Sequence, residues 1–454
     1  MTQASGPKPL PVLGHLIDFG RDPLGFLERV TRGYGCGVKV RVEAERDTYI
    51  VTHPEHVEEV LVHTGRTFQK GYQRHPIMRL VLGNGLVTSE GDFWLRQRRL
   101  AQPAFHRARI AASGETMVRF TDRMVSTWQD GQEIDATEAM SRLTMEIIAQ
   151  TVFDVDLHGD PRASQVGHAV TTMLDEYGRQ MTSAVRALME RLPARLPVPG
   201  EARLHGAVRE LDALMLALVA ERRAEGADRG DLLSMFLAAR DEDGSGMTDA
   251  QLRDELITLF LAGHETTANT LAWALFLLSG HPEVEGKLHA ELASVLGGHP
   301  PGAADFPRLV YTQQVVKEVL RLYPPVWWVS REPLADWVCD DVLVPAGSEV
   351  GLSPWVMHRE AAFYPEPLAF QPGRWTPEFE AGLPRYAYFP FGGGPRLCIG
   401  NNFALMEAVL VLATLTQRYH LEVLDPARVA PEPSLTLRPR GGLRVRLHAR
   451  TGAA

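Results

Sequence analysis

Cysteine is scarce in this chain of 454 residues, which contains only Cys36, Cys339 and Cys398. Three cysteines cannot build the disulfide framework on which many small secreted domains depend, and their number fits a reducing compartment. The four-cysteine spacing that holds an iron–sulfur cluster is absent as well. We therefore expect a cytoplasmic protein in which Cys36 and Cys339 are structural residues.

A membrane anchor and an excess of positive charge are missing too. Residues 1–14 contain neither the apolar core of a signal peptide nor a stretch of about 20 apolar residues, the length that crosses a bilayer. The net charge is −9, and no basic run indicates a surface for nucleic acid or for an anionic membrane. We expect no integral membrane segment and no nucleic-acid partner.

Hydrophobic residues, in contrast, are plentiful, at 45% of the chain, so a large core can form. The proline-rich stretches 193–200 and 299–307 are short and are flanked by helical patterns. They indicate loops and not linkers between domains. We therefore predict a single domain over residues 1–454.

The secondary structure that the patterns predict is mostly helical. Alternating apolar residues over 37–52 indicate a β-hairpin, and helical periodicity dominates from about residue 54 to residue 323. Short strands are predicted at 338–344, 420–424 and 443–447. The predicted fold class is mainly α with small β-sheets.

Cys398 lies in a glycine-rich turn that precedes an apolar helical segment. The turn reads Phe391-Gly-Gly-Gly-Pro-Arg-Leu-Cys-Ile-Gly400. Its glycines permit backbone conformations in which amide N–H groups converge on the sulfur, and the N-terminus of the following helix favours negative charge. Such a turn favours the thiolate over the thiol, whose ordinary pKa is roughly 8.5. A lone Cys-x-Gly would more often be an ordinary buried cysteine.

A second notable segment is a long apolar helix predicted over 248–278. Thr248 and Gln251 fit the capping box that begins a helix. Glu265 and Thr266 are unexpected in its apolar middle.

A local opening of this helix is permitted around the same residues. Gly263 weakens a helix by up to about 1 kcal/mol relative to alanine, although close helix packing would also explain a glycine. The Thr266 hydroxyl can bond the carbonyl of Ala262 one turn earlier, which is also the common behaviour of a buried threonine.

Two metal-binding patterns are incomplete. His264-Glu265 would begin the zinc motif His-Glu-x-x-His, but the second histidine position is Ala268. The stretch 241–252 begins like a calcium-binding EF-hand loop, but its twelfth position is Leu252 and not glutamate. We predict neither metal at these places.

Taken together, the motifs resemble those of the cytochrome P450 family. The turn around Cys398 matches the haem-binding signature Phe-x-x-Gly-x-Arg-x-Cys-x-Gly, and Ala262-Gly-His-Glu-Thr266 is similar to the oxygen-activating helix of the family. Glu318-Val-Leu-Arg321 and Phe370-Gln-Pro-Gly-Arg-Trp375 follow in family order. The resemblance covers essentially the whole chain and implies the cytochrome P450 fold, with haem between the long helix and the helix after the cysteine loop.

The resemblance also implies roles for individual residues. Cys398 would be the axial ligand of the haem b iron, and Glu265 with Thr266 the acid–alcohol pair that supplies protons during oxygen activation. Glu318, Arg321 and Arg374 would lock the core behind the haem. The residues expected around the haem propionates are Trp94, Arg98, Arg331 and Arg396. The residues expected in the substrate pocket are Val87, Ala262, Val326, Val329 and Leu435, while Trp327 and Trp328 would either narrow the pocket or pack in the core.

The implied activity is monooxygenation, in which one atom of dioxygen enters a C–H or C=C bond of an apolar substrate such as a fatty acid, terpenoid or carotenoid. The chain has no flavin or iron–sulfur module, so electrons from NAD(P)H would arrive through a separate ferredoxin or flavodoxin and its reductase. Arginines expected to attract such an acidic partner, if they are not merely solvated helix faces, are Arg96, Arg99, Arg107 and Arg109.

Two alternatives remain open. A peroxide-driven peroxygenase would use the same thiolate, although that group typically replaces the acid–alcohol pair with a carboxylate-binding arginine. A non-enzymatic haem sensor would bind a ligand and release no product.

Overall fold

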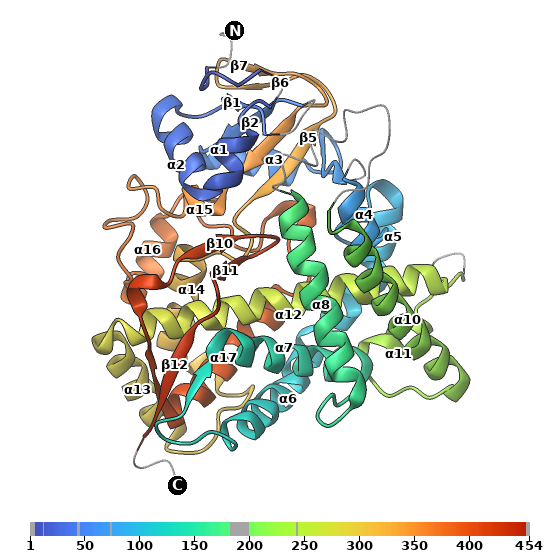
Figure 1. Ribbon diagram of the computed structural model, residues 1–454, viewed down its shortest axis with the longest axis vertical. Helices are drawn as coiled ribbons and strands as arrows, with labels where there is room; N and C mark the ends of the chain where they lie inside the picture. Colours follow the sequence, from blue (N-terminus) through green and yellow to red (C-terminus); the bar gives the residue numbers. More distant parts are fainter. Residues whose placement is uncertain are drawn as a thin grey trace.

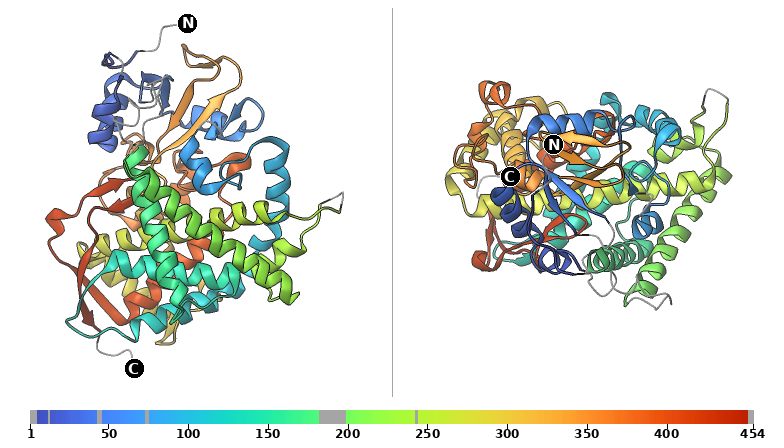
Figure 2. Two further views of the ribbon diagram at one scale, coloured as in Figure 1. Left: turned by 45° about the vertical axis from the view of Figure 1, so that its right-hand side comes forward. Right: turned by 90° about the horizontal axis from the view of Figure 1, so that it is seen from above.

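The structure is a computed structural model that describes residues 5–11, 13–42, 46–72, 75–181, 199–241 and 244–450. Helices form one large body, and most of the strands gather at one end of it (Figures 1 and 2). The chain therefore has the predicted mainly α class with small sheets. The longer helices are α2 (Pro23–Tyr34), α3 (Pro54–Val62), α5 (Gly91–Ala101), α6 (Arg107–Val125), α7 (Ala136–Phe153), α8 (Pro161–Met181), α10 (Glu201–Glu225), α12 (Asp249–Ser279), α13 (Pro282–Leu296), α14 (Val310–Leu322) and α17 (Asn401–Arg418).

Shorter elements connect these helices. The short α-helices are α1 (Leu16–Arg21), α4 (Pro76–Leu82), α11 (Leu232–Ala238), α15 (Pro354–Met357) and α16 (Pro377–Gly382). The 3₁₀ turns are η2 (Gln102–Phe105), η3 (Phe306–Arg308), η4 (Pro372–Arg374), η5 (Gly394–Arg396) and η6 (Pro426–Arg428).

Helix α12 crosses the molecule and packs against α7, α10, α14 and α17 (Figure 1). It begins as predicted, because the Thr248 side chain accepts from the Gln251 N–H while the Gln251 side chain accepts from the Thr248 N–H. Its apolar residues are buried on nearly every side, which explains why it has no polar face in the sequence. The helix places its central residues in the middle of the fold.

The predicted hairpin is present as β1 (Val38–Val40) paired with β2 (Thr48–Val51), with Val38 opposite Ile50. It belongs to a five-stranded sheet in the order β1-β2-β8-β5-β3, completed by β3 (Phe68–Gln69), β5 (Val329–Pro333) and β8 (Glu349–Leu352). We did not predict β5 and β8. They are short and buried on both faces, so they lack the alternation that marks a strand.

The remaining strands form small sheets, and they include the predicted strands near 420–424 and 443–447. The stretch 338–344, predicted as one strand, is instead a hairpin of two antiparallel strands with a turn at Asp340. Their bounds are β4 (Glu133–Asp135), β6 (Trp337–Cys339), β7 (Val342–Val344), β9 (Tyr419–Val423), β10 (Pro431–Pro433), β11 (Leu437–Pro439) and β12 (Arg444–Ala449).

A buried ion network ties α14 to the turn η4. The Glu318 carboxylate accepts from Arg321 at 2.8 Å, from Arg374 at 3.0 Å and from the Trp375 indole at 2.9 Å. Glu318 and Arg321 are fully buried. The Arg321 guanidinium also donates to the carbonyl groups of His358 and Pro367, so its charge is well hydrogen-bonded. This geometry fits the expected structural role of the three charged residues.

The predicted loops and the incomplete calcium pattern can also be placed. Residues 299–305 carry no regular structure ahead of η3, as predicted, whereas most of the stretch 193–200 lies outside the described residues. Asp241 forms an ion pair with Arg96 at 2.5 Å, and Asp243 lies outside the described residues. The Asp241 carboxylate therefore joins the loop before α12 to α5 through an ion pair.

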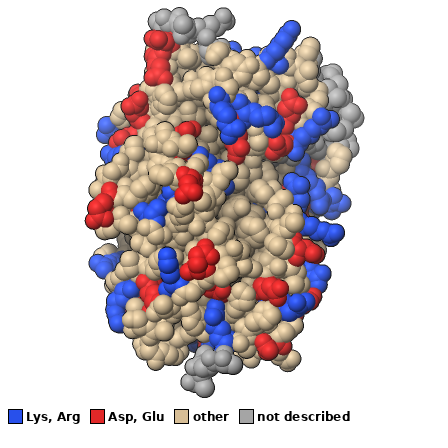
Figure 3. All heavy atoms as spheres, turned by 90° about the vertical axis from the view of Figure 1, so that its left-hand side faces the viewer, with Lys and Arg blue, Asp and Glu red and all other residues tan. Residues whose placement is uncertain are grey.

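Lys and Arg side chains occur together with Asp and Glu side chains on the face drawn in Figure 3, within a larger uncharged surface. None of the helices among the described residues combines the length and the apolarity that crossing a bilayer requires.

Candidate active site

A cavity of about 760 Å³ lies in the middle of the fold. Its walls include α12, the loop before α17, the start of β5 and the turn between β10 and β11. All of the residues predicted for the site line this one cavity: Val87, Trp94, Arg98, Ala262, Glu265, Thr266, Val326, Val329, Arg331, Arg396, Cys398 and Leu435.

The cysteine loop is held by a tight turn. The Cys398 N–H donates to the Phe391 carbonyl at 3.1 Å. Gly394 has a φ of +61°, and a Cβ at this position would lie 2.1 Å from the Leu61 carbonyl oxygen of α3. Glycine is therefore required both for the backbone conformation and for the approach of α3. Cys398 is one of three free cysteines, and its accessible surface faces this internal cavity and not the outer surface of the protein.

The loop does not lower the pKa of the Cys398 thiol as we predicted. Burial raises this pKa, and the Gly400 N–H and the positive charges of Arg98 and Lys70 oppose the rise without cancelling it. The predicted hydrogen bond from the loop backbone is present, but removal of the sulfur from water outweighs it. Coordination to a metal ion deprotonates a cysteine outright, so the raised value does not prevent a thiolate ligand.

The centre of α12 presents polar groups to the same cavity. The Thr266 hydroxyl donates to the Ala262 carbonyl at 2.7 Å, as predicted. The helix nevertheless runs without interruption through Gly263, so the opening that the sequence permits is absent in this structure. A Cβ on Gly263 would lie 2.7 Å from Ile148 of α7, which means that this glycine also serves close helix packing.

Glu265 is buried, at 8% exposure, beside the turn that joins β10 and β11. Burial raises the pKa of its carboxyl to about 7, although a hydrogen bond with Thr436 and the charge of Arg438 act in the opposite direction. A carboxyl with this pKa exchanges its proton readily near neutral pH.

Positive side chains gather at one part of the cavity wall. Arg396 lies 3.9 Å above the Trp94 ring and is ion-paired with Glu90, while its Nη1 atom is buried and has no hydrogen-bond partner. Arg331 is buried and donates to the Thr64 hydroxyl at 2.9 Å. Arg98 donates to the Leu397 carbonyl at 3.1 Å, next to the cysteine.

Two charged residues at this part of the wall belong to no motif in the sequence. The Lys70 amino group donates to the Val87 carbonyl at 3.0 Å and borders the cavity. Burial, with repulsion from Arg331 and Arg396, holds its pKa well below the ordinary value. Glu90 provides the carboxylate that pairs with Arg396. No motif surrounds either residue, so only the fold could bring them here.

The rest of the lining is mainly apolar, as predicted. Trp327 packs in the core and its indole N–H donates to the Ser434 carbonyl at 3.0 Å. Trp328 lies against Gly351, where a Cβ would come within 1.9 Å of its ring. Both tryptophans also border the cavity, so each side chain packs against its neighbours and lines the cavity at the same time.

These features fit a haem with a cysteinate ligand. A thiol borders the cavity, a threonine and a carboxyl group enter it from α12, and buried cations line the wall near Cys398. The unpartnered Arg396 Nη1 atom is suited to a haem propionate, because a buried donor without a partner is costly. The fold and the cavity thus define a haem-thiolate protein.

Comparison with known proteins gives the family. The sequence profile of the family described as Cytochrome P450 matches residues 4–445. The chain is 38% identical to Cyclooctatin synthase of Streptomyces melanosporofaciens over 95% of this chain and 92% of that protein. It is 36% identical to Pentalenene oxygenase of Streptomyces avermitilis, over 98% of this chain and 97% of that protein. The chain belongs to the cytochrome P450 family and is a haem-thiolate monooxygenase.

Two further similarities are consistent with this assignment. The chain is 36% identical to Cyclooctat-9-en-7-ol 5-monooxygenase of Streptomyces melanosporofaciens, over 96% of this chain and 91% of that protein. The solved structure of a cyanobacterial cytochrome P450, CYP120A1 with retinoic acid bound, matches with a TM-score of 0.87 at 25% identity, covering 99% of this chain and 100% of that one. Haem and dioxygen are the cofactor and the co-substrate of this family.

Proposed function

We propose that this monooxygenase oxidises a terpenoid, by hydroxylation or epoxidation. The observation that carries the proposal is the largely apolar cavity shared by Cys398 and Thr266. The names of two similar proteins support the substrate class, because they denote oxygenation of pentalenene, an unsaturated hydrocarbon, and of cyclooctat-9-en-7-ol. The fatty acid alternative has no comparable support from these names.

In this proposal Cys398 holds the iron, while Arg98, Arg331, Arg396 and Trp94 hold the propionates. The haem supplies oxygen activation and transfer of one oxygen atom to the substrate. Lys70 adds a further amino group near the same part of the wall. The chain's contribution is to fix the cofactor's orientation and to balance its negative charge.

In this proposal Glu265 and Thr266 of α12 supply the protons. The Thr266 hydroxyl donates to the Ala262 carbonyl in the structure, and rotation about its χ1 would turn the O–H toward the cavity. Glu265 would replace that proton, because its pKa of about 7 leaves it partly protonated at neutral pH. The two residues hold and move protons, while the apolar residues Val87, Ala262 and Val329 limit the access of bulk water.

Substrate class can be tested by titrating the purified haem protein with a panel of cyclic terpenoid hydrocarbons and alcohols. We expect the absorbance change that follows displacement of iron-bound water, with affinities at least about tenfold higher than for a straight-chain fatty acid. The reverse ranking would exclude the terpenoid proposal while leaving the enzyme class intact. Products of turnover, identified by mass spectrometry, should carry one additional oxygen atom.

We further propose a cytoplasmic protein that acts as one domain over residues 1–454 and receives NAD(P)H electrons through a separate ferredoxin or flavodoxin with its reductase. Arg96 is ion-paired with Asp241, and Arg109 donates to the Gly230 carbonyl at 3.2 Å. These two arginines therefore serve the fold. Arg99 interacts within the fold as well, so Arg107 remains the candidate for docking an acidic partner among these four arginines.

The electron source distinguishes the proposal from a peroxygenase and from a haem sensor. We expect product when NAD(P)H, reductase and ferredoxin are all present, and much less with peroxide alone. Faster turnover with peroxide would favour the peroxygenase. Tight ligand binding without product under both conditions would favour the sensor.

A further inference from the structure

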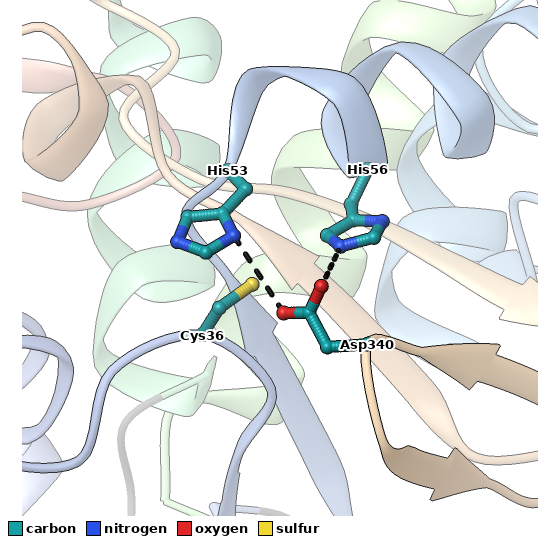
Figure 4. A group of neighbouring side chains, drawn as sticks. All are labelled: Cys36, His53, His56 and Asp340. Atoms are coloured by element: carbon teal, nitrogen blue, oxygen red, sulfur yellow. Dashed lines mark hydrogen bonds and ion pairs between the residues drawn. The ribbon is translucent and has the colours of Figure 1, made fainter.

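A group of metal-ligating side chains lies outside the haem cavity, where the start of α3 meets the turn before β1 and the turn between β6 and β7. Cys36, His53, His56 and Asp340 each offer one ligand atom, and these atoms all lie within 4.8 Å of one another. Figure 4 shows the four side chains pointing toward a common centre. None of them lines the haem cavity.

Three separate segments supply these residues. Cys36 lies in the turn between α2 and β1, flanked by Gly35 and Gly37, which both have positive φ. His53 is the N-cap of α3, and His56 follows in the first turn of that helix. Asp340 lies in the turn between β6 and β7 and has a φ of +50°. The fold alone brings the set together, and the sequence analysis therefore took Cys36 for a structural residue.

The distances suit a small ion that binds four ligands. The His56 Nε2 atom lies 2.8 Å from one Asp340 carboxylate oxygen, and the His53 Nδ1 atom lies 3.6 Å from the other. In a tetrahedral zinc site the bonds measure about 2.0–2.3 Å, so neighbouring ligand atoms stand roughly 3.3–3.8 Å apart. The most distant pairs of ligand atoms would have to approach each other by about 1 Å, which rotation of the exposed side chains allows.

The donor types favour zinc. One thiolate, two imidazoles and one carboxylate form a mixed set of sulfur, nitrogen and oxygen, which matches zinc and is too soft for calcium or magnesium. The thiolate and the carboxylate carry two negative charges, which a divalent ion neutralises. Binding would release the thiol proton of Cys36 to solvent.

Neighbouring contacts hold the segments in place. The Trp337 indole of β6 donates to Glu59 of α3 at 3.0 Å and meets the His56 ring edge to face, with centroids 6.0 Å apart. These contacts fix α3 against the β6–β7 hairpin, so two of the three segments are already positioned without a metal. Such support around the ligands is a usual property of metal sites.

We propose that Cys36, His53, His56 and Asp340 form a structural zinc site that ties the α2–β1 turn and the β6–β7 turn to the start of α3. All four protein ligands are used, so the site is closed and has no position for a substrate. Helix α3 approaches the cysteine loop at Leu61, where Gly394 is required. The zinc site therefore anchors the opposite end of a helix that packs against the haem loop.

The test measures zinc and iron together in the haem-loaded full chain, prepared without a histidine tag. The protein is incubated with zinc chloride, freed of loose metal by gel filtration and measured by plasma mass spectrometry. Haem iron counts the protein molecules, and we expect about one zinc per iron. X-ray absorption at the zinc edge should show one sulfur at about 2.3 Å and nitrogen or oxygen atoms at about 2.0–2.2 Å.

Variants identify the ligands. Cys36→Ser and Asp340→Asn should each weaken zinc binding by more than about 100-fold, since a lost ligand costs more than a lost supporting contact. Asparagine tolerates the left-handed conformation, so Asp340→Asn preserves the turn. Asp341→Asn, which makes the same charge change one residue away, is the matched control and should keep its zinc. Haem absorbance checks that each variant is folded.

Substitution of Cys339 distinguishes zinc binding from the formation of a disulfide. Its sulfur lies 3.7 Å from that of Cys36, so an oxidant could join the two. In our proposal Cys339→Ser retains zinc, and zinc-treated protein carries a free Cys339 thiol by mass spectrometry. The proposal is overturned by a wild-type protein without zinc, by equal zinc in wild type and Cys36→Ser, or by a Cys36–Cys339 disulfide that persists in the zinc-treated protein.

Discussion

At the scale of single residues, the site depends on groups whose ionisation or hydrogen bonding is changed by burial. The pKa of Cys398 is raised because its thiol lies deep in the fold, at the cavity wall, and the pKa of Glu265 is raised because its carboxyl is buried. The motifs indicated which residues would meet in the cavity. They did not indicate Lys70 or Glu90, because each comes from a segment without a recognisable pattern and acts only through the fold.

Thr266→Ala tests the proposed proton supply. Product formation per NAD(P)H consumed should fall, on the order of 10–100-fold, while peroxide release rises, because the positioned hydroxyl is lost. Product and peroxide are measured together in the reconstituted system. Thr414→Ala is the matched control, since Thr414 makes the same kind of bond to a carbonyl one turn earlier, at 2.7 Å, but lies outside the cavity. Equal coupling in both variants would contradict the role of Thr266.

The raised pKa of Glu265 predicts a dependence of stability on pH. The carboxyl has a pKa of about 7 in the folded chain and about 4.5 when unfolded, so folding favours its protonated form. Below both pKa values the Glu265 carboxyl is protonated in the folded and in the unfolded chain, so it does not change the stability of the fold. As the pH rises from about 4.5 to 7 it increasingly destabilises the fold, by roughly 3 kcal/mol at most.

Glu265→Gln removes this ionisation. Its melting temperature relative to wild type should therefore rise between pH 5 and pH 8. Thermal unfolding followed by circular dichroism across this range measures the difference. A difference that does not change with pH would show that Glu265 ionises in the folded protein as easily as in water.

At the scale of secondary-structure elements, the sequence predicted the features that neighbouring residues in the chain determine. The capping box placed the start of α12, and the end of helical periodicity at about residue 323 placed the end of α14. The hairpin of β1 and β2 followed from alternation. Strands β5 and β8 could not be predicted, because pairing with distant segments and burial on both faces define them. The packing of Gly394 against α3 likewise depends on a contact between distant residues.

The buried ion network between α14 and η4 should contribute more to stability than any other charged network discussed above. Glu318→Gln leaves Arg321 and Arg374 buried without their shared partner, so we expect a loss of about 3–5 kcal/mol in the free energy of unfolding. Denaturant unfolding of the haem protein measures this loss. Glu380→Gln removes only the half-exposed ion pair with Lys317 and should cost less than about 1 kcal/mol. Similar losses for the two variants would contradict a structural lock.

At the scale of the whole molecule, one cavity gathers residues from segments that span most of the chain, from Phe19 to Thr436. The family assignment rests on similarity along almost the same length. The described residues thus build one chemical site around this cavity, while the proposed zinc site lies outside it, at the start of α3. The two can be examined independently, because they share no residue.

The central claim is that Cys398 binds the haem iron as a thiolate, and the most direct measurement is the absorption spectrum of the reduced protein with carbon monoxide. Wild type should show the red-shifted Soret band that is typical of thiolate ligation, and Cys398→Ser should lack it while Cys36→Ser and Cys339→Ser retain it. A red-shifted band of normal intensity in Cys398→Ser would contradict the account.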